Sequence, residues 1–126
     1  DPQGLSSERA QRDLAVAKAL MYTCYQMYHR TASGISAEYV EFPSHQDFVA
    51  GPSAAFYILR PETAESLFVL SQLTGDPIYR DWAWEIWQAI DRSCKTETGV
   101  IFAVIKSQRD TTIRTGAGAW VMVCDL

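Results

Sequence analysis

The stretch Thr74-Gly75-Asp76-Pro77 limits most strongly what this chain can fold into. Glycine readily takes the left-handed conformation that follows the last turn of a helix, and aspartate followed by proline is a typical helix start. Apolar residues recur at helical spacing over residues 61 to about 73 on one side and 77 to about 95 on the other. Two helices joined by so short a turn are expected to pack antiparallel, as an αα-hairpin.

A third helix is expected before this hairpin. Ser6 or Ser7 can cap its start, and the helical apolar pattern continues to about His29. Each of the three expected helices carries one apolar side. In the N-terminal helix this side consists of Leu14, Ala17, Met21, Cys24 and Tyr28, and Tyr22, Tyr25 and Tyr28 add an aromatic side. In the two helices of the hairpin it consists of Leu67, Phe68, Leu70 and Ser71, and of Tyr79, Trp82, Ala83, Ile86, Trp87 and Ile90. Packing into a core is the most direct interpretation of these stripes, so the fold class is predicted to be all-α.

Two segments between the first and second helices are predicted to be irregular. Residues 35–42 read as a short extended piece, and residues 42–55 as a loop broken by prolines and Gly51. Glu41, His45 and Asp47 lie close together in this region, but a solvated trio is the favoured interpretation over a metal site. The sequence therefore assigns no metal ligand within the chain.

The composition excludes several classes of protein. Apolar residues make up 48% and charged residues 21% of 126 residues, which is typical of a globular domain. A net charge of −4 and the lack of a basic stretch argue against nucleic-acid binding. No apolar run reaches the ~20 residues of a membrane-spanning helix. The three cysteines form no Cys-x-x-Cys pair or Cys/His cluster, which makes a zinc site unlikely on sequence grounds.

Charged residues gather where the second helix begins. Arg60 precedes Pro61, and Glu62 and Glu65 follow at a spacing that puts both on one face of the first turn. Carboxylates there can complement the helix dipole without any further role. They can also share a small ligand, at which Arg60 could aim its guanidinium group. Spacing alone favours the first interpretation.

Four blocks in order change that balance. Residues 57–66 (YILRPETAES) resemble the L-R-P-E-x-x-E-S block of glycoside hydrolase family 47, the class I α-mannosidases, and residues 74–86 (TGDPIYRDWAWEI) resemble its T-G-D-x-x-Y-x-x-W-x-W-E block. Residues 22–28 (YTCYQMY) and 34–38 (GISAE) are similar to its T-C-Y-x-M helix end and G-L-S-P-E turn. The resemblance covers residues 1 to about 99.

The resemblance implies that the chain is a piece of an (α/α)7 barrel. Enzymes of this family are calcium-dependent and remove terminal α-1,2-linked mannose from N-glycans, with inversion of configuration at the sugar carbon. Glu62 matches the family's catalytic base, and Arg60 and Glu65 match residues that bind the mannose and order the calcium hydration shell. Glu38 matches a further acid of the substrate pocket. Cys24 matches a cysteine whose disulfide partner would lie before Asp1.

The chain also departs from the family pattern. The proton-donating glutamate, the second catalytic aspartate and the threonine that binds calcium directly are not found, and residues 100–126 look unrelated to residues 1–99. The chain is therefore expected to be inactive alone and to expose unpaired helix faces through which it could self-associate.

Two other interpretations remain open: a non-catalytic glycan-binding or helical interaction fragment, and a generic helical repeat. The resemblance implies a high-mannose N-glycan substrate and a place in the secretory pathway, in the endoplasmic reticulum, the Golgi or the secreted space.

Overall fold

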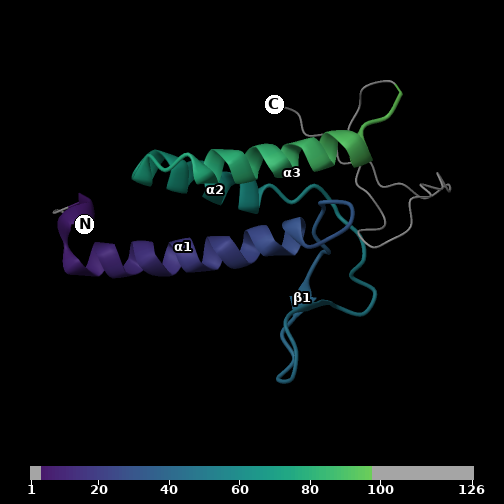
Figure 1. Ribbon diagram of the computed structural model, residues 1–126, viewed down its shortest axis with the longest axis horizontal. Helices are drawn as coiled ribbons and strands as arrows, with labels where there is room; N and C mark the ends of the chain where they lie inside the picture. Colours follow the sequence, from purple (N-terminus) through teal and green to yellow (C-terminus); the bar gives the residue numbers. More distant parts are fainter. Residues whose placement is uncertain (1–3, 98–126) are drawn as a thin grey trace.

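The computed structural model describes residues 4–97, which form three long helices and one small hairpin (Figure 1). A short 3-10 turn, η1 (Gly4–Ser6), precedes α1 (Glu8–His29). The strands β1 (Val40–Glu41) and β2 (Val49–Ala50) follow, and then α2 (Glu62–Thr74) and α3 (Ile78–Cys94). The all-α prediction is thus confirmed for this part of the chain, whereas the divergent tail expected over residues 100–126 lies outside it.

The start of α1 is fixed by a side-chain cap. The Ser7 hydroxyl oxygen accepts a hydrogen bond from the backbone N–H of Ala10 at 3.1 Å. A serine in this position satisfies one of the first N–H groups, which have no partner inside the helix. Ser7 is therefore the cap, and the helix ends at His29 as its apolar pattern predicted.

The turn between α2 and α3 has the expected chemistry. Gly75 has a φ of 68°, and its N–H donates to the Ser71 carbonyl at 3.0 Å. The Asp76 carboxylate accepts from the Ile78 N–H at 3.0 Å. Both helices start one residue later than predicted, because Pro61 and Pro77 occupy the capping position instead of the first turn. The two helices pack against each other as the predicted hairpin.

The core lies where α1, α2 and α3 meet. Ile35 and Leu67 are its largest fully buried side chains, and Gly34 allows the chain after α1 to approach α3 closely. At Gly34, which has a φ of 76°, a Cβ would stand 2.7 Å from the Ala89 Cβ. The buried apolar residues of the helices are Met21, Tyr25, Tyr28, Leu67, Leu70, Tyr79, Ile86, Ala89 and Cys94.

Three aromatic residues expected in the core lie on the surface instead. Phe68 is 64%, Tyr22 52% and Trp87 46% exposed. Each helix packs against its neighbours along a narrow stripe, and a residue one position past that stripe is turned away by about 100°. Leu67 and Ile86 take the buried positions beside Phe68 and Trp87.

The segment predicted as a loop contains half of a hairpin. Val40 pairs with Ala50 and Glu41 with Val49, antiparallel, so residues 42–55 include the strand β2. Arg30 at the end of α1 pairs with the Asp47 carboxylate and lies 5.2 Å from the centre of the Phe48 ring. The prediction of an unpaired loop was wrong because these long-range contacts order it.

Candidate functional site

Arg60 and Glu38 form the ionic centre of the site. The Arg60 Nε–H donates to Glu38 Oε1 at 2.9 Å, and a terminal N–H of the same guanidinium donates to the same oxygen. The Glu38 side chain is 13% exposed and the Arg60 side chain 52%. Glu38 is held by its own backbone, whose N–H donates to the Ala54 carbonyl at 2.9 Å. The structure thus joins two predicted site residues that are 22 positions apart in the sequence.

The second oxygen of Glu38 is available as an acceptor. Glu38 Oε2 is buried and has no hydrogen-bond partner among the described residues. A buried carboxylate oxygen without a donor is costly, since it has lost its water without a replacement. A hydroxyl group or water entering beside Arg60 would supply the missing hydrogen bond.

Glu62 and Glu65 both lie in the first turn of α2, and both are exposed. The Glu38 carboxylate, and to a smaller extent the Glu62 carboxylate, raises the pKa of Arg60 above its ordinary value. Glu62 therefore lies near enough to share the field of this arginine. An exposed carboxylate that water can reach is a candidate proton acceptor.

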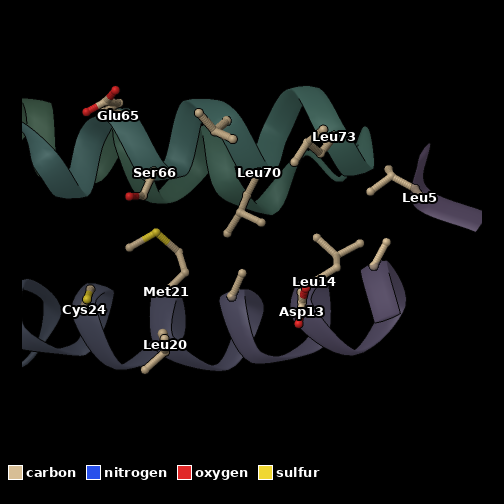
Figure 2. A pocket seen from close by; sticks show the side chains of 13 residues that line it. Leu5, Asp13, Leu14, Leu20, Met21, Cys24, Glu65, Ser66, Leu70 and Leu73 are labelled. Carbon is tan, nitrogen blue, oxygen red and sulfur yellow. The ribbon is translucent and has the colours of Figure 1, made fainter. Parts of the chain in front are cut away.

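Glu65 lies one helical turn after Glu62 on α2. Figure 2 shows it at the rim of an apolar groove between α1 and α2, with its carboxylate on the side of α2 away from Met21. The groove has a volume of about 630 Å³, and Leu70 points into it towards Met21 and Leu14. Its lining is too apolar for a sugar, which needs several polar partners, so the groove is not the sugar site.

A second polar cluster joins α1 to α3. The Tyr25 hydroxyl donates to Glu85 Oε2 at 2.5 Å, and His29 Nδ1 lies 2.7 Å from Glu85 Oε1. The Tyr25 ring also stacks on Trp82, with 4.3 Å between the ring centres. Burial works to raise the pKa of Glu85, but hydrogen bonds from Tyr25 and His29 outweigh it, so the pKa lies below its ordinary value. The sequence reasoning missed this cluster, although Tyr25 and His29 stand one helical turn apart.

Two buried tyrosines lie next to the segment that carries Arg60: Tyr28 was predicted in the core, whereas Tyr57 was not. Tyr28 of α1 and Tyr57 are 4% and 3% exposed, and their rings meet edge to face with 6.0 Å between centres. The Tyr57 hydroxyl donates to the Arg60 carbonyl at 3.3 Å. Tyr57 therefore contacts the backbone of the segment that carries the predicted site residues.

The cysteines and the acidic residues do not form a metal site within residues 4–97, where no group of three His, Cys, Asp or Glu residues could hold an ion. Asp47, one of the trio considered above, pairs with Arg30 instead. Cys24 and Cys94 are both free thiols, and burial raises the pKa of each. No helix in the same range is long and apolar enough to cross a membrane.

The comparison with known families favours the mannosidase interpretation over a generic helical repeat. The sequence profile of Glycosyl hydrolase family 47 matches residues 3–114 of the chain. The chain belongs to this family. The match passes residue 99, where the divergent tail was expected to begin.

The named relatives of this family 47 chain are mannosidases. It is 42% identical over 91 residues to the endoplasmic reticulum mannosyl-oligosaccharide 1,2-alpha-mannosidase of Homo sapiens, a match that covers 68% of this chain and 13% of that protein. It is 38% identical over 98 residues to mannosyl-oligosaccharide 1,2-alpha-mannosidase MNS1 of Arabidopsis thaliana, covering 78% and 17%.

A solved structure shows the same fold. The alpha-1,2-mannosidase from Trichoderma reesei superposes with a TM-score of 0.69 at 27% identity, over 80% of this chain and 24% of that one. The three helices are thus part of an (α/α)7 barrel, as the resemblance implied. The chain spans under a quarter of the length of each of these proteins.

Proposed function

We propose that this chain is part of an enzyme that hydrolyses terminal α-1,2-linked mannose from high-mannose N-glycans. The observation that carries the proposal is the arrangement at the start of α2. Arg60 binds one oxygen of the half-buried Glu38 and leaves the other, buried oxygen free, while Glu62 stays exposed near the same arginine. A sugar hydroxyl can donate to the free oxygen of Glu38, and Glu62 can act on a water next to it. The family match and the names of the relatives support the substrate.

The proposed roles follow from this geometry. Glu62 acts as the general base that takes a proton from the attacking water, which inverts the configuration at the sugar carbon. Arg60, Glu38 and Glu65 bind the mannose. Residues one turn apart, such as Glu62 and Glu65, have Cβ atoms about 5–6 Å apart. The two carboxyl groups of inverting enzymes stand ~6.5–9.5 Å apart, so we assign the acid to a different residue.

Calcium belongs to the proposal only for the whole enzyme. Calcium takes six to eight oxygen ligands, and residues 4–97 contain no cluster that could hold it. In the whole enzyme, Arg60 and Glu65 would orient water molecules around the ion. The secretory pathway is the proposed location, since relatives are named as endoplasmic reticulum enzymes, and the Golgi and the secreted space fit the same chemistry. In that compartment Cys24 would form a disulfide with a cysteine outside this chain.

The test is a chimera in which residues 4–97 replace the matching segment of the Trichoderma reesei alpha-1,2-mannosidase. We expect the chimera to release mannose from an α-1,2-mannoside, and Glu62→Gln to slow that release by about 100- to 10,000-fold, the range for loss of a general base. Glu8→Gln is the matched control, because Glu8 is also the first residue of a helix. A chimera that folds, binds the mannoside and releases mannose equally fast with Glu62→Gln would refute the role of Glu62.

The isolated chain is expected to release no mannose, since it offers a base without a proton donor. Binding of the mannoside by a folded chimera without any turnover would favour the alternative of a non-catalytic glycan-binding fragment.

A further inference from the structure

The backbone that carries Arg60 and Glu62 has an unusual support. Helix α2 begins after Pro61 with no side-chain cap among the described residues, so its start is not held in the way that Ser7 holds α1. The first residues of a helix need some partner if they are to keep one position. The start of α2 is supported instead from the core, by the buried tyrosines Tyr57 and Tyr28.

These two tyrosines, the tyrosine pair, pack edge to face inside the core. The Tyr57 hydroxyl donates to the Arg60 carbonyl at 3.3 Å. Burial raises the pKa of Tyr28, and the nearby hydroxyl groups of Tyr57 and of Thr63, which is in the first turn of α2, lower it by a smaller amount. Burial raises the pKa of both tyrosines, so their hydroxyl groups keep their protons and remain donors. The two tyrosines thus lie against Arg60 before Glu62 and against Thr63 after it.

The backbone next to the tyrosine pair is strained. Leu59 has a φ of 58°, a left-handed conformation that a leucine rarely adopts, and its side chain packs against the core. Such a conformation persists only where surrounding contacts impose it. The turn at Leu59 lets Tyr57 point inwards while Arg60 emerges at the surface.

We propose that Tyr57, supported by Tyr28, is a positioning residue of this site: its hydroxyl holds the Arg60 backbone so that the guanidinium meets Glu38 and Glu62 stands beside it. The catalytic meaning of this arrangement rests on the proposed function, but the arrangement itself does not. Tyr57 touches no substrate and acts through Arg60.

The experiment follows the Arg60 Nε–H by ¹H–¹⁵N NMR in the full 126-residue chain. This proton is hydrogen-bonded to Glu38 Oε1 at 2.9 Å and should exchange slowly with water. We expect Tyr57→Phe to speed its exchange by about 2- to 10-fold, the effect of one ordinary hydrogen bond. Glu38→Gln is the positive control, since it removes the ion pair directly.

Tyr25→Phe is the matched negative control. It removes a hydroxyl from another buried tyrosine of α1, which bonds Glu85 and not the site, so it should leave the Arg60 signal unchanged. Should Tyr57→Phe fail to fold, Tyr28→Phe tests the same tyrosine pair and is expected to speed the exchange of the Arg60 Nε–H as well.

Equal Arg60 exchange in wild type and Tyr57→Phe, or an equal effect of Tyr25→Phe, would overturn the proposal. The result does not depend on turnover, so it stands apart from the chimera test. If Glu62→Gln abolishes activity in the chimera but Tyr57→Phe leaves the Arg60 exchange unchanged, the positioning role fails and the function survives. If the chimera is inactive but Tyr57→Phe speeds the Arg60 exchange as expected, the proposed function fails and the positioning role survives.

Discussion

Leu59 offers the sharpest test of how the site backbone is held. Its φ of 58° puts a residue with a Cβ in the left-handed region, at a cost of about 1–2 kcal/mol. Glycine escapes this cost but loses about 0.5–1 kcal/mol more backbone entropy on folding than alanine does. Leu59→Gly and Leu59→Ala both remove the packed side chain, so their difference isolates the backbone. The glycine variant should therefore be more stable than the alanine variant, by about 0.5–1 kcal/mol.

Urea denaturation followed by far-UV circular dichroism measures this difference in free energy of unfolding. Ala64→Gly is the control, because Ala64 is an exposed residue inside α2, where glycine should be less stable than alanine by about 1 kcal/mol. The sign of the comparison must thus reverse between positions 59 and 64. If the alanine variant is the more stable one at both positions, Leu59 does not have a left-handed backbone. The positioning of Arg60 would then rest on the Tyr57 hydrogen bond alone.

Three further results are expected. Leu67→Ala should lower the free energy of unfolding by about 2–5 kcal/mol, since it opens a cavity at a fully buried position, whereas Leu73→Ala at a half-exposed position should cost about 0.5 kcal/mol in the same urea experiment. A carboxyl whose pKa is lowered by folding stabilises the fold above its unfolded value near 4.5 and loses that contribution as the pH falls, so wild type should lose more melting temperature than Glu85→Gln between about pH 5 and 3; equal losses would show that Tyr25 and His29 do not stabilise the charge. The isolated chain should self-associate through its exposed apolar faces, and a cooperatively melting monomer in light scattering would contradict this.

The helices were predictable because their signals are local. Ser7 caps α1 and Gly75 ends α2 through contacts within four residues along the chain, which the residue types alone dictate. The apolar stripes placed Leu67, Leu70 and Ile86 correctly in the core. They did not place Phe68 and Trp87, because a stripe drawn from hydrophobicity is wider than the line of contact between two helices.

The β-hairpin formed by β1 and β2 was not predictable, because its contacts are long-range. Each of its strands has two residues, and their order depends on partners far away, such as Arg30 for Asp47. Strand propensity carries little information in a pair so short, since cross-strand contacts determine whether it forms.

The candidate site combines both situations. The spacing of Arg60, Glu62 and Glu65 left a shared ligand open but favoured a helix-dipole role, whereas the structure turns Arg60 towards Glu38 and leaves Glu65 at the edge of the groove. The difference arises at Leu59, whose left-handed backbone no helical pattern predicts. Binding groups often lie on such segments, because a loop set on a rigid core can aim a side chain where a regular helix cannot. A residue that breaks local preference beside a charged pair is therefore evidence for a site in its own right, and at Leu59 it points to the backbone that Tyr57 holds.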